Sequence, residues 1–190
     1  MKITYEICLF NPNEKLERCI RGKVNSLLKN YYLAYYSQLT DDSVTLKRID
    51  GSTFTHRVSY YCSKWCNAGY CVYNGSFFLD APEEDESYGI LIGTSDVSPT
   101  PDDYKLGSQF SCWCSAVNIS DVYEEAGSLS LDISRLFLND NVDTIVKEFG
   151  LVARAKADDT TYPVLILRDV VSPIDFPVDY SLSIKLKFSF

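Results

Sequence analysis

Apolar residues near the start of the chain recur at steps of three and four positions, with charged residues between them. They are Leu16, Cys19, Ile20, Val24, Leu27 and Leu28. The preceding run 11–14 reads Asn-Pro-Asn-Glu, which places a capping Asn, a first-turn Pro and a Glu where a helix start favours them. This pattern predicts an amphipathic helix from residue 11 to about residue 30.

After this segment the apolar period shortens to two, which is the period of a β-strand. Residues 31–39 are rich in aromatic side chains and predict a strand. Two further apolar runs flank Asp50-Gly51 between residues 44 and 58. Because Asp-Gly readily adopts the positive φ angles of tight hairpin turns, we expect a β-hairpin over 44–58.

The second half of the chain alternates apolar and polar residues most clearly. Residues 181–190 place Leu182, Ile184, Leu186 and Phe188 on one face and serines and lysines on the other. Such strands bury one face and leave the other in water, as antiparallel sheets do. The expected strands lie at residues 76–79, 88–93, 128–138, 144–149, 164–171 and 181–190. The sequence therefore predicts a mainly β protein, an antiparallel β-sandwich with an N-terminal helix (α+β).

The length of 190 residues is that of one ordinary domain. We expect a single domain over 1–190. Within it, residues 1–30 form the helical element and residues 31–190 the β-sandwich, with a cysteine- and aromatic-rich excursion at 60–80.

Charge and hydropathy exclude two classes of partner. The chain carries 26 acidic and 18 basic side chains, a net charge of -8, whereas nucleic-acid binding usually needs a basic face. The one basic group, interleaved with acids as on a solvated helix face, is Lys15, Arg18, Arg21, Lys23 and Lys29. No apolar run is long enough to span a bilayer, and the first residues lack a signal-peptide pattern. We therefore expect neither nucleic acid nor membrane as a partner.

The cysteines offer two interpretations. The chain has seven, an odd number without a secretion signal, which favours reduced thiols. The metal candidates are Cys62, Cys66, Cys71, Cys112 and Cys114. Their spacing differs from the paired C-x2-C knuckles of zinc sites, so we favour the second interpretation, in which they are small buried hydrophobic residues.

The sequence contains no enzyme signature. His56 is the only histidine, and we expect this strand residue to face solvent rather than to serve a nucleophile. The adjacent acids Asp102-Asp103 and Asp158-Asp159 fall in expected loops, where neighbouring side chains usually diverge into water. No glycine-rich phosphate loop is present. We expect a protein without catalytic residues or cofactor.

The most aromatic part of the excursion is a candidate binding surface. Its members are Trp65, Tyr70, Tyr73, Phe77 and Phe78. Aromatic side chains supply large contact areas at low entropic cost, which suits an interface. Packing in the core explains the same residues equally well, and both alternatives remain open.

Four motifs follow one another between residues 88 and 190. A strand ending in Gly-Thr at 90–94 precedes a Pro-x-x-x-Asp-Tyr-x-Leu loop at 99–106. A Glu-x-Gly-Leu strand end follows at 147–151, and then a strand at 165–174 that runs from Leu-Ile-Leu-Arg to Ser-Pro-Ile. In this order the motifs resemble those of small β-rich structural proteins of tailed bacteriophages. The excursion, the segment 112–114 and the N-terminal helix lie outside the resemblance.

The resemblance implies a virion protein of the tail, neck or fibre region, without active site or cofactor. A ring or adaptor of the neck or tail is the position we favour, because the chain has no shaft repeat or coiled coil. The implied partners are other virion proteins (portal, tail, neck or fibre) and further copies of this chain in a symmetric homo-oligomer. Its location would be the virion, after synthesis in the bacterial cytoplasm. The alternative is a binding module or zinc-stabilised protein that uses Cys62–Phe78.

Overall fold

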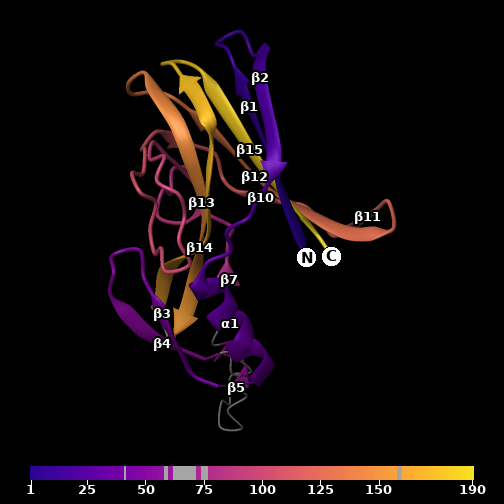
Figure 1. The fold of residues 1–190 in the computed structure, drawn as a ribbon, viewed down its shortest axis with the longest axis vertical. Coiled ribbons are helices and arrows are strands. Elements are labelled where there is room, and N and C mark those ends of the chain that lie inside the picture. The colour runs from indigo at the N-terminus through magenta and orange to yellow at the C-terminus, as the bar shows by residue number, and fades with distance from the viewer. Residues whose placement is uncertain (41, 58–59, 62–71, 74–76, 158–159) are drawn as a thin grey trace.

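The computed structural model describes residues 1–190 except 41, 58–59, 62–71, 74–76 and 158–159, and at 60–61, 72–73 and 156–157 it describes the backbone alone. Two antiparallel sheets dominate the fold (Figure 1). The larger sheet has the order β10(Asn118–Ile119), β12(Ser128–Leu138), β15(Ser181–Ser189), β1(Lys2–Phe10), β2(Leu16–Lys23), and β9(Trp113–Cys114) and β11(Tyr123–Glu125) also pair with β12. The smaller sheet has the order β14(Thr160–Phe176), β13(Thr144–Ala157), β7(Phe77–Phe78), and β8(Gly89–Gly93) also pairs with β13.

The inner faces of the two sheets share one hydrophobic core. Every second residue of β15 from Leu182 to Phe188 is buried, while the residues between them are exposed or half-buried. These side chains belong to the same cluster as Phe149 of β13 and Val164 of β14. The predicted fold class, a mainly β antiparallel sandwich with a helix near the N-terminus, is confirmed.

The N-terminal helix predicted over residues 11–30 is wrong. That region forms a turn and the strand β2, which pairs with β1 along its length. The side chain of Asn11 does accept backbone N–H hydrogen bonds, from Asn13 and Lys15 at 3.0 and 3.1 Å, but these close a turn instead of starting a helix. The prediction from helical spacing is wrong because pairing with β1 determines the local structure of this segment. The basic residues from Lys15 to Lys23 therefore lie on a hairpin, not on a helix face.

The predicted strand 31–39 is also wrong, because the chain there forms the helix α1(Lys29–Thr40). The buried face of α1 consists of the small residues Asn30, Ala34 and Ser37. Asn30 fixes the helix to two strands: its side-chain amide donates to the carbonyls of Lys47 and Leu165 at 2.8 and 3.2 Å. Small inner residues let the helix approach the sheet closely. Of the tyrosines that suggested a strand, Tyr32, Tyr35 and Tyr36 are exposed, whereas Tyr31 packs against the core.

The predicted hairpin and the later strands are confirmed. β3(Val44–Lys47) pairs with β4(Thr53–His56), and Gly51 at the turn has a φ of 88°. The Asp50 carboxylate accepts a hydrogen bond from the Ser52 amide at 2.8 Å, which fixes the turn. The expected strands at 76–79, 88–93, 128–138, 144–149, 164–171 and 181–190 are all present, and β13 and β14 extend beyond their predicted limits. A short hairpin of β5(Tyr60–Tyr61) and β6(Val72–Tyr73) completes the described elements.

Figure 1 shows how the appendages sit on the sandwich. α1 and the β3–β4 hairpin lie together at one end, and the hairpin that contains β11 projects sideways from the body as an arm. The arm turns at Ala126 and Gly127, whose φ angles of 50° and 77° are those of a tight hairpin turn. The two ends of the chain lie next to each other at the base of the arm.

Candidate interaction surfaces

One buried ion pair joins the loop after β8 to the strands β13 and β14. Glu148 of β13 is fully buried, and its carboxylate accepts hydrogen bonds from the backbone amides of Gly107 and Ser108 at 3.1 and 2.8 Å. Arg168 of β14 donates to the same carboxylate at 2.7 Å. The loop 94–108, which follows β8, is thereby fastened to the smaller sheet.

Arg168 holds the same loop at two further points. Its guanidinium donates to the Asp103 carboxylate at 2.6 Å and to the Val97 carbonyl at 2.9 Å. Burial acts to raise the pKa of Asp103, but hydrogen bonds from Thr100 and Arg168 and the arginine's charge outweigh it, so that pKa is lowered. We call these contacts the Glu148–Arg168 network. The expectation that both acids of Asp102-Asp103 point into water is wrong for Asp103, whereas Asp102 is exposed.

Two glycines make room for this network. A Cβ atom on Gly93 would collide with the Ser108 carbonyl and the Glu148 carboxylate, and one on Gly107 would collide with Ser95. Only glycine lets the backbone approach these groups so closely. The Gly-Thr strand end of the resemblance therefore has a structural explanation at Gly93.

The network leaves no reactive group available. The Glu148 carboxylate is surrounded by donors, and the Arg168 side chain, 3% exposed, is held by two carboxylates and a carbonyl. A charge that is buried and fully paired serves to fix the structure rather than to bind a substrate. Sequence analysis identified both residues as parts of matching segments but not as partners, because they lie 20 positions apart on two strands.

A second buried arginine, Arg135 of β12, has a different set of partners. It is 1% exposed and donates only to backbone carbonyls, five in all. The acceptors, at 2.8 to 3.1 Å, are the carbonyls of Pro82, Asp85, Tyr88, Ile90 and Ser115. Burial lowers the pKa of Arg135. This side chain connects the segments before β8 and after β9 to the larger sheet, and nothing in the sequence pattern distinguishes it from an exposed strand residue.

The described cysteine candidates are buried thiols with raised pKa values. Cys112 and Cys114 are buried, and burial together with the nearby Glu86 carboxylate raises the pKa of Cys112 to about 12. The pKa of Cys114 is raised as well, chiefly by burial. Metal binding and nucleophilic attack both need the thiolate, which burial disfavours here. The other candidates, Cys62, Cys66 and Cys71, lie outside the described residues.

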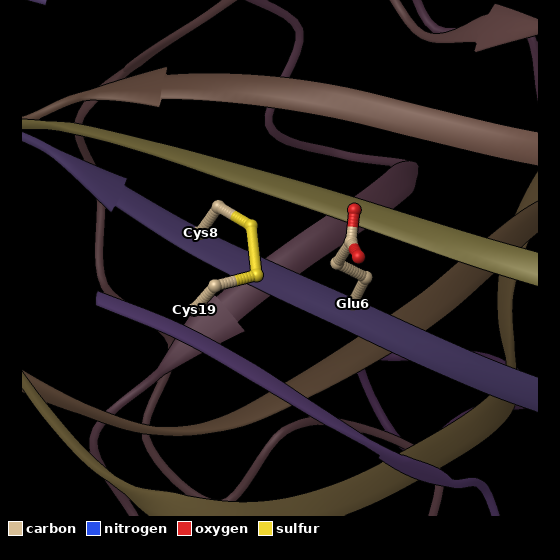
Figure 2. Close-up of side chains that lie close together, drawn as sticks. All are labelled: Glu6, Cys8 and Cys19. Atoms are coloured by element: carbon tan, nitrogen blue, oxygen red, sulfur yellow. A yellow bond between two sulfur atoms is a disulfide. The ribbon is translucent and has the colours of Figure 1, made fainter. Parts of the chain in front are cut away.

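The prediction of reduced thiols is wrong for one pair. Cys8 of β1 and Cys19 of β2 lie directly opposite each other, with Cα atoms 4.1 Å apart, and form a disulfide (Figure 2). The carboxylate of Glu6 lies near the two sulfurs, so these residues form a group of potential metal ligands. In the disulfide neither sulfur is a thiolate, and Glu6 is paired with Arg21. The predicted helix concealed this pair, because it placed only one of the two cysteines within the element.

His56 is buried, so the expectation of a solvent-facing histidine is wrong. Its ring stacks on Phe77 with centroids 5.6 Å apart and meets the edge of Phe54 at 6.3 Å. Asp158-Asp159 lies outside the described residues.

The aromatic interface candidates are only partly described. Phe77 packs on His56 and against the core, and Phe78 beside it is 37% exposed. Trp65 and Tyr70, and the side chain of Tyr73, lie outside the described part of the structure. Where it is described, the candidate cluster therefore contributes one side chain to the core and one to the surface.

Within the part of the chain that the structure describes, exposed tyrosines gather on α1, where the sequence predicted a strand. Tyr32, Tyr35, Tyr36 and Leu39 recur at helical spacing and are 50 to 68% exposed. We call these four residues the helix face. Their spacing is that of an amphipathic helix whose apolar stripe normally packs against another surface. Here the inner face is small and polar, and the apolar stripe is on the outside.

A second exposed apolar surface lies at the base and along the arm. It comprises Met1, Val122, Leu129 and Phe190, which are 54 to 62% exposed and which we call the arm-end surface. Phe190 donates its backbone N–H to the Leu129 carbonyl at 2.8 Å, and Met1 lies beside Phe190 because Lys2 pairs with Ser189. A hollow of about 280 Å³ lined by Met1 and Tyr32 joins this surface to the helix face.

A third apolar group lies beyond the other ends of β12 and β15. Val142, Ile145 and Val178 are 37 to 55% exposed, and we call them the far-end patch. Val142 and Val178 stand on neighbouring loops, because the Val178 amide donates to Asp143 at 2.8 Å. None of these three residues is distinguished in the sequence, where single apolar residues in loops are common.

A hollow of about 630 Å³ on the outer face of the larger sheet has most of its charges paired. Arg21 is paired with Glu6 and Lys187 with Glu125, and Tyr123 donates to Asp132 at 2.9 Å. Lys185 in the same lining enters no ion pair among the described residues. These pairs leave little unsatisfied charge for a ligand, and we assign no site here.

Comparisons with family models, with curated proteins and with solved structures give no match to this chain. Among the described residues, no helix is both long and apolar enough to cross a membrane.

Proposed function

We propose that this protein is a non-enzymatic structural subunit of a tailed-bacteriophage virion, a ring or adaptor component of the neck or tail that assembles as a symmetric homo-oligomer. The observation that carries the proposal is the Glu148–Arg168 network. The Gly-Thr strand end, the Asp-Tyr loop, the Glu-x-Gly-Leu strand and the Leu-Ile-Leu-Arg strand are far apart in the sequence, yet they meet around one ion pair. Segments that resemble one family and also bond to one another behave as one structural unit.

The distribution of polar groups supports a structural role. The buried charged side chains of Glu148, Arg168 and Arg135 form hydrogen bonds with backbone groups of loops and strands. The described thiols Cys112 and Cys114 are held protonated by burial, and the ring of His56 is packed between aromatic rings. Such groups stabilise a scaffold and supply no nucleophile or general base.

The exposed surfaces support repeated assembly. The helix face and the arm-end surface place tyrosine, leucine, phenylalanine and methionine in water on one side of the chain. Contiguous apolar surface of this kind usually marks a contact with another protein. In a symmetric particle each subunit needs only a modest interface, because many copies act together. The proposed partners are therefore further copies of this chain and the neighbouring virion proteins.

Light scattering and negative-stain imaging of the purified protein test the assembly part of the proposal. We expect particles of uniform size with a mass that is a fixed multiple of 21.5 kDa. A protein that remains monomeric at all concentrations, in the presence and absence of neighbouring virion proteins, would contradict it.

A further inference from the structure

The arm-end surface and the far-end patch lie at opposite ends of the same two strands. Leu129 is near the start of β12, and Val142 follows its last residue, Leu138. Phe190 follows the end of β15, and Val178 precedes its start. A strand rises about 3.3 Å per residue, so the length of β12 separates the two surfaces by roughly 35 Å. They cannot meet within one chain.

The arm-end surface continues the inner face of the larger sheet past its covering layer. Leu129 stands on the same face of β12 as the buried Ile133, and Phe190 continues the buried row that ends at Phe188. β12 pairs with β15 only from Ser130 onward, so the arm extends beyond the sheet. An inner sheet face without a covering layer is a surface that a second protein can cover.

The Met1 side of the arm-end surface and the far-end patch carry charges of opposite sign. Lys2 and Lys23 are exposed beside Met1 and line the same hollow, whereas Asp121, Glu124 and Glu125 are exposed along the arm, where Glu125 is paired with Lys187. The far-end patch is surrounded by exposed acids, namely Asp140, Asp143, Asp175 and Asp179. Among the described residues, Lys2, Lys23 and these four acids enter no ion pair. Charges of opposite sign that are unpaired in one molecule can pair between two.

We propose that the arm-end surface of one copy binds the far-end patch of the next copy, in a head-to-tail contact. The inference rests on the proposed homo-oligomeric function and names the two surfaces that would form its repeating contact. A head-to-tail contact joins two different surfaces, and it closes into a ring when the rotation per subunit is right. The occupant is a second copy, because this chain itself carries an exposed apolar patch whose surrounding acids complement Lys2 and Lys23.

Two blocked variants test the contact. Leu129→Asp with Phe190→Asp removes apolar area from the arm-end surface and adds negative charge that the acidic far end repels. Val142→Lys with Val178→Lys removes apolar area from the far-end patch and adds positive charge, which Lys2 and Lys23 repel. Val97→Asp is the matched control, because Val97 is 66% exposed on the loop 94–108 and belongs to neither surface. Circular dichroism and thermal melting verify that each variant folds, as expected for substitutions of exposed side chains.

Light scattering then measures the mass of each variant alone and of the two blocked variants mixed in equal amounts. We expect each blocked variant alone to be monomeric and the control to assemble like the unsubstituted protein. The mixture should form dimers of one copy of each variant. The variant with substitutions at Leu129 and Phe190 keeps its far-end patch, and the variant with substitutions at Val142 and Val178 keeps its arm-end surface, so these two intact surfaces can bind each other. Assembly of either blocked variant, or a mixture that stays monomeric, would overturn the head-to-tail contact.

The same measurement separates failure of the contact from failure of the proposed function. If the unsubstituted protein assembles but the blocked variants assemble equally well, the contact is wrong and the homo-oligomeric function stands. If the unsubstituted protein itself stays monomeric, the homo-oligomeric function fails, and the contact with it.

Discussion

The middle of the sandwich and its two ends differ in their charged and apolar side chains: in the middle, charged side chains are buried and paired, whereas at the ends apolar and charged side chains are exposed. In the middle, the buried side chains of Glu148 and Arg168 are paired with each other and with the loop 94–108. At the ends, Leu129, Phe190 and Val142 are exposed, and among the described residues Lys2, Lys23 and the acids of the far end enter no ion pair. We infer from this difference that stability and association depend on separate residues. A substitution in the middle should therefore change the free energy of unfolding, and a substitution at the ends should change association.

The largest loss of stability is expected from Glu148→Ala. The substitution leaves the buried Arg168 guanidinium without its main partner and frees three loop amides, and breaking such a pair costs about 3 to 5 kcal/mol. Urea denaturation measures this loss. The double variant Glu148→Ala with Arg168→Met should be more stable than the single variant, because no unpaired charge is then buried. A loss below about 1 kcal/mol for the single variant would contradict the role of the network.

Loss of the Cys8–Cys19 disulfide should have the next largest effect on stability. The bond joins residues 11 positions apart, and restricting a loop of that length in the unfolded chain is worth about 3 kcal/mol. Replacing both cysteines by serine, or adding a reductant to the unsubstituted protein, should lower the free energy of unfolding by the same amount. If reductant has no effect on the urea midpoint and peptide mapping finds both thiols free, the disulfide is absent in solution.

A smaller, pH-dependent loss is expected from Asp103→Asn. The pKa of Asp103 is lowered in the folded protein, so its contribution to stability is present above the unfolded-state value of about 3.9 and disappears as the pH falls through the folded value. The variant should therefore be less stable at pH 7 and lose less stability on acidification below pH of about 4. Denaturation curves across this range measure both slopes. Identical slopes for the two proteins would show that Asp103 is not the titrating group.

At the ends, salt should change association and leave stability unchanged. Raising the ionic strength shortens the range of interactions between exposed charges, so the contact between the lysines at the arm and the acids of the far end should weaken. Light scattering at low and high sodium chloride should find smaller particles at high salt, and the urea midpoint measured at low protein concentration should shift little. Larger particles at high salt would indicate a contact without charge complementarity.

The smallest expected effect is on the reactivity of the buried Cys112 thiol. Because burial raises the pKa of Cys112 to about 12, we expect negligible modification of Cys112 by a thiol reagent at pH 8 in the folded protein. Peptide mass spectrometry after labelling resolves this cysteine from the others, and labelling in urea is the control. Rapid labelling of Cys112 in the folded state would place it at the surface.

The sequence predicts the back half of the fold well and the front half poorly. β15 alternates along its whole length and β12 from Ser128 to Ser134, and alternation is a local signal that the sandwich preserves. At α1 and β2 tertiary contacts decide: pairing with β1 converts a helical spacing to a strand, and the small residues Asn30, Ala34 and Ser37 let an aromatic segment pack as a helix.

The exposed surfaces and the buried network could not be read from the sequence for a related reason. The pairing of Glu148 with Arg168 depends on the register of two strands, and the burial of Arg135 depends on five carbonyls from other segments. Leu129 and Phe190 look like ordinary core positions in the alternating pattern. They are exposed because the alternation continues past the point where the sandwich ends.

The measurement that tests the central claim most directly is mass spectrometry of purified phage particles from a host that produces this chain. The account predicts that peptides of this chain remain with the particles through density-gradient purification, at a fixed ratio to the portal or tail proteins. Peptides found only in the soluble lysate, and never in the particles, would contradict it.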